Sequence, residues 1–249
     1  TARELSEKKA DAVFKGNPIM DLAGEAVGKP GGHRPFGVLL LPGSRERAYD
    51  DLGLLLGAAE VIALEGDCRF EMVVASTLER ERLLEKAPSW RVDSPDVIRH
   101  EKGKPEVRLF SGEVSRAASR SDILIGLGGT ANQICAGMGL PVVSIDEKGK
   151  RVQKKLLGEA ESLVTADPVS LAREALAILG DPARYERMSR AGMERMGGGG
   201  ALEAVIEYAS RTLGWEKRQE VCRVFGIYVE KNSGRTGSEL EEHGDDRSW

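Results

Sequence analysis

Short apolar runs alternate with longer amphipathic segments along most of the 249-residue chain. The runs lie at residues 36–41, 70–74, 107–110, 123–125, 142–145 and 162–164. Runs such as Ile-Leu-Ile and Val-Val-Ser-Ile do not alternate regularly with polar residues, which is typical of parallel strands that helices bury on both faces. The pattern therefore predicts an α/β fold with a doubly wound, Rossmann-like parallel sheet.

The segments between these runs have the spacing of amphipathic helices. After the first run, apolar residues recur at helical spacing and form one stripe: Leu52, Leu55, Leu56, Ala59, Ile62 and Ala63. Shorter helices are expected at 78–87, 113–119 and 131–138. Strands and helices thus alternate along the chain, as they do in βαβ units.

The C-terminal part of the chain is predicted to be helical. Asp167-Pro168 and Asp181-Pro182 each place a capping acid before a proline at the first helical position. Helices should begin there and run to about residues 179 and 196. Four consecutive glycines at 197–200 must separate them from a further helix at 201–213, because glycine is costly inside a helix.

Glycines and prolines around residues 28–35 mark a linker before the first strand. We therefore expect the Rossmann-like domain to span 29–213, with a separate segment, 1–28, before it. Residues 214–249 are expected to form a last helix and a disordered tail, because 230–249 are rich in Ser, Gly, Glu and Asp and have almost no apolar pattern.

Composition excludes several classes of protein. A net charge of −4 argues against nucleic-acid binding, which needs a concentrated positive surface. Cys68, Cys135 and Cys222 have neither metal-ligand nor redox spacing, so no disulfide framework, metal or other cofactor is expected, and a cytoplasmic protein fits. No apolar run approaches the ~20 residues of a membrane span, while peripheral contact with a membrane stays open.

The first candidate site is the turn Pro42-Gly43-Ser44-Arg45, between the first strand and its helix. Gly43 can adopt a conformation that other residues avoid, and the following amides open toward the helix, which suits an anion. Ser44 can add a hydroxyl donor, and the Arg45 guanidinium matches the oxygens of a phosphate. The alternative is a plain strand-to-helix turn with a surface arginine.

The second candidate is Gly128-Gly129-Thr130, which also follows a buried strand and opens a helix. Its amides and the Thr130 hydroxyl form a second potential anion site. Parallel strands have all their carboxyl ends at one edge of the sheet, so both turns could face one diphosphate there.

Other interpretations of this region stay open. Gly126, Gly128 and Ala131 fit the dinucleotide pattern G-x-G-x-x-G/A, and Asp146 follows where a ribose-binding acid is expected, so NAD or flavin binding is an alternative. A basic cluster lies either beside the same crevice or on a solvated helix face: Lys148, Lys150, Arg151, Lys154 and Lys155. No motif identifies a catalytic base.

Four motifs, in this order, carry a family resemblance. They are Phe14-Lys15-Gly16-Asn17-Pro18-Ile19-Met20-Asp21, then Leu40-Leu41-Pro42-Gly43-Ser44-Arg45 before Ala48-Tyr49, then Gly129-Thr130-Ala131-Asn132-Gln133 running into Gly139-Leu140-Pro141-Val142-Val143, and the helical stretch 179–196. With them, residues 1–213 resemble the C-terminal half of GT-B glycosyltransferases, most closely the lipid-A-disaccharide synthase-related proteins.

The resemblance implies a two-domain enzyme whose C-terminal domain binds a nucleotide-sugar donor, usually a UDP-sugar. It further implies that the N-terminal acceptor domain is missing here and that 1–28 corresponds to the crossover between the domains. By analogy, Gly43, Ser44 and Arg45 lie by the diphosphate, Phe110 and Ser111 by the base, and Gly128, Gly129 and Thr130 by the phosphates. Asn132 and Gln133 complete the implied donor site.

One position departs from the family pattern. Related sequences place a glutamate for the ribose hydroxyls in the first turn of this helix, where this chain has Gln133. An amide oxygen still accepts hydrogen bonds but lacks the charge that strengthens them. We therefore expect the donor-binding half of a hexosyltransferase, inactive without its partner domain, with three alternatives: a non-catalytic binding module, a sugar-nucleotide epimerase and an NAD-binding domain.

Overall fold

A computed structural model describes residues 13–23, 35–79 and 82–213. The chain divides into two compact units, Thr1–Ala204 and Val205–Trp249, and the sheet with all the candidate residues belongs to the first. Helix α8 (Ala201–Thr212) spans the division. The last helix and tail predicted at 214–249 lie outside the described residues, as does most of the segment 1–28.

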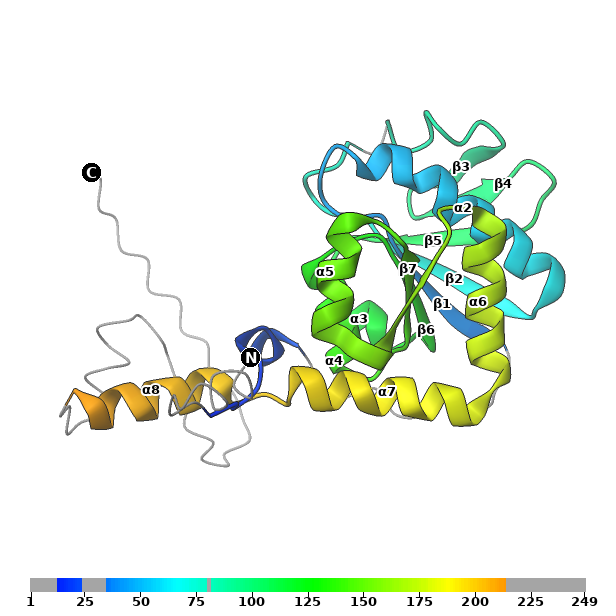
Figure 1. Cartoon of the computed structure of the whole chain (residues 1–249). Coiled ribbons are helices and arrows are strands. Elements are labelled where there is room, and N and C mark those ends of the chain that lie inside the picture. The colour runs from blue at the N-terminus through cyan, green and yellow to red at the C-terminus, as the bar shows by residue number, and fades with distance from the viewer. Residues whose placement is uncertain (1–12, 24–34, 80–81, 214–249) are drawn as a thin grey trace, which may run out of the picture. The chain divides into compact units, whose positions relative to one another are not determined.

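An eight-stranded sheet forms the centre of the first unit, with the order β3-β4-β5-β2-β1-β6-β7-β8 (Figure 1). The strands are β1 (Phe36–Leu41), β2 (Cys68–Val73), β3 (Trp90–Ser94), β4 (Val97–His100), β5 (Glu106–Phe110), β6 (Ile123–Gly126), β7 (Val142–Ile145) and β8 (Glu161–Val164). All neighbouring pairs from β5 to β8 are parallel. The predicted doubly wound α/β fold is therefore confirmed.

The edge formed by β3 and β4 corrects the prediction of a wholly parallel sheet. β3 pairs with β4, and β4 with β5, in antiparallel directions. Only Pro95 and Asp96 connect β3 to β4, and five residues connect β4 to β5, which is too short for a crossover helix. In β3 only Trp90 is buried and the other four residues are exposed, as at the edge of a sheet.

The charged helix predicted at 78–87 is also wrong for the residues that the structure describes there. They form turns, and the amides of Arg82, Glu85 and Ala87 each donate to a carbonyl three residues earlier rather than four. Leu78, Leu83 and Ala87 are buried against the core. These side chains reach the core from successive turns of the loop, not from one face of a helix.

Helices cover both faces of the sheet and form two apolar cores. The larger core contains α2 (Ala48–Glu65) and α6 (Pro168–Gly180), while the smaller contains residues of α3 (Val114–Ala118), α4 (Thr130–Gly137) and α5 (Lys148–Leu157). Leu40 of β1 points into the first core, and Leu39 and Leu41 into the second, as the pleat of a strand requires. Helix α7 (Pro182–Met196), along the lower edge of the sheet in Figure 1, contributes to both.

The predicted helix starts are confirmed. Asp167 accepts a hydrogen bond from the Ser170 amide at 2.8 Å, and Asp181 accepts one from the Arg184 amide at 3.0 Å. Helix α7 ends at Met196, and its C-cap Gly197 has a φ of 71°, which favours glycine, so the glycine run does interrupt the helix.

The short 3₁₀ helix η1 (Pro18–Leu22) lies within the first family-like motif. The amide of Asn17 donates to the Met196 carbonyl at 2.7 Å, and Asp21 accepts a hydrogen bond from the Leu202 amide at 2.9 Å. Residues 17–21 are thus attached to the end of α7 and the start of α8.

Candidate functional site

The carboxyl ends of the central strands surround a pocket of about 1000 Å³. From β1 the chain first moves to β2 on one side and later returns to β6 on the other, so the order of the strands reverses at β1 and β6. Ligands of open α/β sheets bind at such a switch point. The loops after β1, β2, β5, β6 and β7 all line the pocket.

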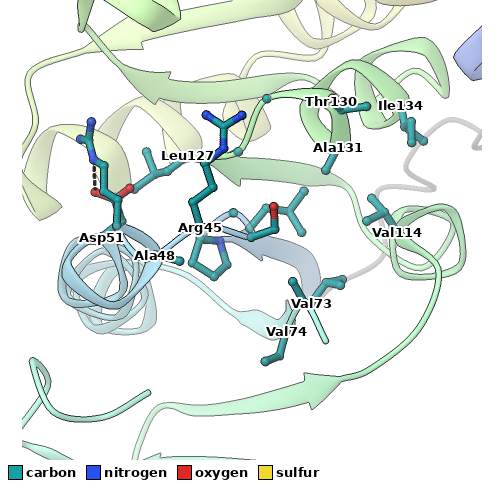
Figure 2. A pocket seen from close by; sticks show the side chains of 18 of the residues that line it. Arg45, Ala48, Asp51, Val73, Val74, Val114, Leu127, Thr130, Ala131 and Ile134 are labelled. Atoms are coloured by element: carbon teal, nitrogen blue, oxygen red, sulfur yellow. Dashed lines mark hydrogen bonds and ion pairs between the residues drawn. The ribbon is translucent and has the colours of Figure 1, made fainter. Parts of the chain in front are cut away.

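The structure brings the two glycine turns together at this pocket. The amide of Leu127 donates to the Leu41 carbonyl at 2.8 Å, which continues the β1–β6 pairing into the loops. Most of the predicted site residues line the pocket, namely Gly43, Ser44, Arg45, Ser111, Gly128, Gly129 and Thr130. The Arg45 side chain projects from the first turn into the pocket (Figure 2). That these residues contact a ligand stays a prediction.

Three helices begin at the pocket without a capping side chain. Arg47, Gly129 and Glu147 occupy the N-cap positions of α2, α4 and α5, and none of them caps its helix through its side chain. The first amides of a helix have no partner within the helix and carry a partial positive charge. In α2, however, the amides of residues 48–50 already donate to the carbonyls of residues 45–47, so the helix starts that suit an anion are those of α4 and α5.

Asn132 lies beneath the second turn and does not line the pocket. Its side chain is fully buried, and Nδ2 donates to the Gly126 carbonyl at 2.8 Å. The Ser144 hydroxyl donates to the same carbonyl at 2.8 Å. A β-carbon on Gly126 would lie 2.3 Å from the Asn132 amide oxygen, so glycine is required there. Asn132 thus supports the turn from below.

Replacing Asn132 by alanine is expected to lower the free energy of unfolding by about 2 kcal/mol, because the Gly126 carbonyl loses a buried donor and a small cavity remains. Urea denaturation measures the loss. Ser144→Ala removes the other donor and a smaller group, so it should cost about 1 kcal/mol. Unchanged stability in Asn132→Ala would contradict this role.

Phe110 and Gln133 also lie outside the residues that line the pocket. The Phe110 ring packs against Gly112, and a β-carbon added to Gly112 would lie 2.6 Å from Cζ of this ring. The Arg120 guanidinium stacks on the same ring, 4.9 Å from its centroid. Gln133 is half-buried on α4. The structure therefore does not bring these two side chains together with the glycine turns.

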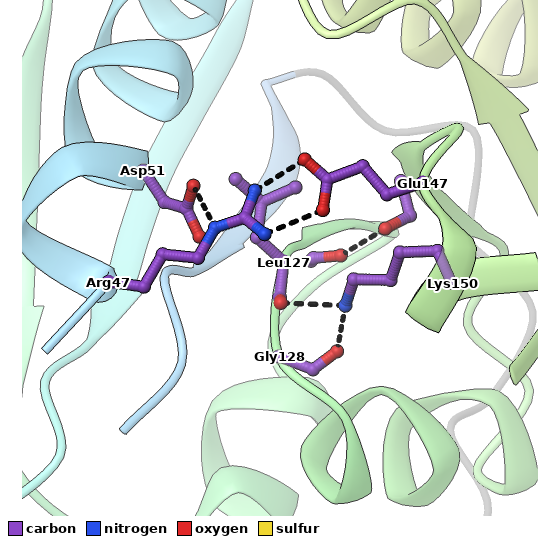
Figure 3. Close-up of polar contacts among 8 residues, drawn as sticks. Arg47, Asp51, Leu127, Gly128, Glu147 and Lys150 are labelled. Carbon is purple, nitrogen blue, oxygen red and sulfur yellow. Dashed lines mark hydrogen bonds and ion pairs between the residues drawn. The ribbon is translucent and has the colours of Figure 1, made fainter. Parts of the chain in front are cut away.

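A bridge of charged side chains that the sequence analysis missed crosses the pocket (Figure 3). Arg47, at the start of α2, donates to both carboxylate oxygens of Glu147, at 2.6 and 2.5 Å, and to Asp51 at 3.2 Å. The hydrogen bonds from Arg47 lower the pKa of Glu147, whereas burial raises the pKa of Asp51. The bridge ties the loop after β1 to the loop after β7.

Lys150 alone of the predicted basic cluster lines the pocket. Its ammonium donates to the Leu127 carbonyl at 2.6 Å and also to the Gly128 carbonyl. Burial lowers the pKa of Lys150. Of the alternatives for this cluster, Lys150 lies beside the crevice, while Lys148, Arg151 and Lys155 lie outside its lining.

The charges around the pocket leave a positive excess. Three basic and two acidic side chains line it: Arg45, Arg47, Lys150, Asp51 and Glu147. Arg47 pairs with both carboxylates. Within the described part of the chain, Arg45 and Lys150 form no ion pair with a carboxylate, so the pocket keeps a net positive charge. The Lys150 ammonium is held by backbone carbonyls, and the Arg45 guanidinium is the group that remains for an anionic ligand.

Over residues 13–23, 35–79 and 82–213, no group of three or more His, Cys, Asp or Glu side chains could hold a metal ion. No helix in the same ranges is long and apolar enough to span a membrane.

Solved structures share the fold of this chain. A putative UDP-N-acetylglucosamine 2-epimerase from Listeria monocytogenes matches 87% of the chain with 16% identity and a TM-score of 0.59. A co-structure of S. aureus MnaA with UDP matches 84% with 15% identity and a TM-score of 0.57. Sucrose-phosphate synthase from Thermosynechococcus elongatus matches 73% with 17% identity and a TM-score of 0.50.

These similarities show the fold, a Rossmann-like α/β domain of the GT-B type. The chain spans only 58%, 56% and 46% of the lengths of the three structures. No protein-family model and no curated protein sequence matches the chain. The specific resemblance to lipid-A-disaccharide synthase-related proteins therefore stays a prediction.

Proposed function

We propose that this chain is the donor-binding half of a GT-B glycosyltransferase related to lipid-A-disaccharide synthase, and that its pocket holds the diphosphate of a UDP-sugar. One observation carries the proposal. Two glycine turns from separate strands, an uncapped helix start and the guanidinium of Arg45, which pairs with no carboxylate in the described residues, all face a single pocket that carries a net positive charge. A diphosphate needs several donors at once, and this arrangement supplies them from a fixed backbone.

The site would act on the donor as a fixed positive environment. In sugar transfer, negative charge grows on the diphosphate as it leaves, and donors already in place stabilise that charge without reorganising. Arg45 would contribute a charge-assisted hydrogen bond, and the turns would contribute neutral ones. Transfer also needs an acceptor site, which a partner domain would provide.

The nature of the nucleotide is supported by the structural neighbours. One of them is a complex with UDP, and another is described as acting on UDP-N-acetylglucosamine. The same neighbours favour a second candidate function, a sugar-nucleotide epimerase. Gln133, which lacks the charge of the family's glutamate, favours the third, a non-catalytic binding module.

The dinucleotide alternative has less support from the geometry. In that pattern Asp146 would accept hydrogen bonds from a ribose. Asp146 instead forms a two-pronged ion pair with Arg151, at 2.6 and 3.0 Å, and does not line the pocket of the glycine turns.

Calorimetric titration of the chain with UDP, UDP-N-acetylglucosamine and NADH tests the proposal. We expect both uridine nucleotides to bind and NADH not to bind. If neither uridine nucleotide binds at millimolar concentration, the proposal is overturned. Binding of NADH alone would favour the dinucleotide alternative. A sugar-transfer assay with a longer protein that includes an acceptor domain would separate a transferase from a non-catalytic module.

Replacing Arg45 by alanine is expected to weaken UDP binding about tenfold or more, because a charge-assisted hydrogen bond to phosphate is lost. Arg190→Ala is a matched control, since Arg190 is an exposed arginine of α7 whose ion pair among the described residues is with Glu186. Both variants remove one positive charge. Equal UDP affinity in the two variants would remove Arg45 from the site.

A further inference from the structure

Each backbone carbonyl of the second glycine turn, from residue 126 to residue 129, accepts at least one hydrogen bond. Asn132 and Ser144 hold the Gly126 carbonyl, and the backbone amides of residues 132 and 133 donate to the Gly129 carbonyl. Between these two, the carbonyls of Leu127 and Gly128 both accept hydrogen bonds from the ammonium of Lys150. The two peptide groups at the centre of the turn therefore depend on one side chain from α5.

Holding these carbonyls also fixes the direction of two amides. The Leu127 carbonyl and the Gly128 amide belong to one planar trans peptide group, so they point in opposite directions. The same holds for the Gly128 carbonyl and the Gly129 amide. Both amides are thus turned away from Lys150, and neither forms a hydrogen bond within the described residues. Two neighbouring amides without a partner are available to bind an anion.

A glycine pair needs such a restraint. Glycine has access to both signs of φ, so a Gly-Gly turn without a partner samples several peptide orientations. A β-carbon on Gly129 would meet no atom within 4 Å, so packing does not restrain that residue. A cation on the carbonyl side also polarises both peptide groups, which makes their amides better donors.

Lys150 is itself held in place. The carboxylate of Glu147, the N-cap residue of α5, accepts two hydrogen bonds from Arg47, the N-cap residue of α2. On the same face of α5, Gln153 and Leu157 are buried. The burial of Gln153 and Leu157 and the contact of Glu147 with Arg47 together fix the rotation of α5 about its axis. This rotation directs the Lys150 side chain to the turn.

We propose that Lys150 is a positioning residue, whose contacts with the Leu127 and Gly128 carbonyls pre-form an anion site from the amides of Gly128 and Gly129. The inference rests on the proposed function for the identity of the anion, a nucleotide diphosphate. Lys150 acts on that ligand through the turn rather than by contact with it.

Two variants of Lys150 and one control test this role. Lys150→Met keeps an unbranched side chain as far as Cε and removes the ammonium, whereas Lys150→Arg retains a cation that can donate to two carbonyls. Lys154→Met is the matched control, because Lys154 also lies on α5 and also binds a backbone carbonyl, that of Glu161, but does not line the pocket. Thermal melting curves establish that each variant is folded.

The first readout needs no ligand. In ¹H–¹⁵N spectra of the free protein, Lys150→Met should shift the amide signals of Gly128 and Gly129, while Lys150→Arg keeps them near their original positions. The second readout is UDP affinity, which should fall about tenfold in Lys150→Met, as expected when two neutral donors lose alignment. Lys150→Arg should recover most of the affinity, and Lys154→Met should retain it.

The outcomes separate this inference from the proposed function. If the unaltered protein binds no UDP, the proposed function fails, and the glycine signals alone decide whether Lys150 positions the turn. If the unaltered protein binds UDP and Lys150→Met binds it equally well, the inference fails and the proposed function stands. Weaker binding with unchanged glycine signals in the free protein would mean that Lys150 contacts the ligand directly, which also overturns the positioning role.

Discussion

Replacing Gly192 by alanine is expected to lower the free energy of unfolding by about 3 kcal/mol, with a fall in Tm of roughly 10 °C. Gly192 lies on α7 at a close approach to α4. A β-carbon there would lie 2.2 Å from the carbonyl oxygen of Ala136 and 2.9 Å from its carbonyl carbon. Because these are backbone atoms of a packed helix, the clash can be relieved only by moving α7 away from α4.

Gly149→Ala provides the matched control for this prediction. Gly149 also lies in a helix, α5, but a β-carbon on it would meet no atom within 4 Å. Alanine has the higher helix propensity, so this substitution should be neutral or stabilising by up to about 1 kcal/mol. Urea and thermal denaturation of both variants measure the difference. Equal stabilities would show that α7 tolerates a side chain at its contact with α4.

The parts of the fold that the sequence predicted are those that local patterns determine. The runs at 123–125 and 142–145 are fully buried strands because helices cover both faces of the sheet, and this is what their uninterrupted apolar character indicated. The starts of α6 and α7 were predictable since an acid followed by proline specifies a helix start without help from the rest of the chain.

The errors arose where distant contacts decide the structure. The antiparallel edge strands β3 and β4 have few apolar positions, and they are stabilised by the pairing of β3 with β4 and of β4 with β5. In the segment 78–87 the charged residues resemble an exposed helix, yet the loop is held by contacts such as the hydrogen bond from the Glu79 amide to the Tyr49 hydroxyl, 2.7 Å. Neither contact has a local signature.

The candidate site shows the same division. Each glycine turn is a local feature, and the rule that parallel strands end at one edge was enough to predict that the two turns meet. The bridge between Arg47 and Glu147 joins residues 100 positions apart, so no local pattern could indicate it. The basic cluster was visible in the sequence, but which of its members faces the turn was not. That depends on the rotation of α5 about its axis, which the burial of Leu157 fixes in the folded chain.

Replacing Glu161 by glutamine is expected to stabilise the protein progressively as the pH rises. Glu161 begins β8 and is fully buried, with its Oε1 accepting a hydrogen bond from Gln153 at 2.6 Å. Its Oε2 has no hydrogen-bond partner within the described residues. Burial raises the pKa of Glu161 from 4.5 to about 7, against the opposing effects of Gln153, Lys150 and Lys154 on α5.

The direction of the effect follows from this raised pKa. The folded protein binds a proton at Glu161 more tightly than the unfolded chain, so the stability that this group contributes is fully present below pH 4.5 and is lost as the pH rises to about 7. Glutamine stays neutral at every pH. The advantage of Glu161→Gln over the unaltered protein should therefore grow by roughly 2–3 kcal/mol between pH 5 and pH 8.

Urea denaturation of both proteins at several pH values between 5 and 8 measures this change. The difference between the two proteins is the informative quantity, because the remaining carboxylates titrate in both. Glu174→Gln is a suitable control, since hydrogen bonds from Arg184 and Ser162 contribute to a lowered pKa of Glu174. Its stability relative to the unaltered protein should not rise between pH 5 and 8, because a carboxylate of lowered pKa contributes stability throughout that range. A pH-independent difference for Glu161→Gln would mean that the Glu161 carboxylate is already ionised in the folded protein at pH 5, and that Lys150 and Lys154 offset its burial.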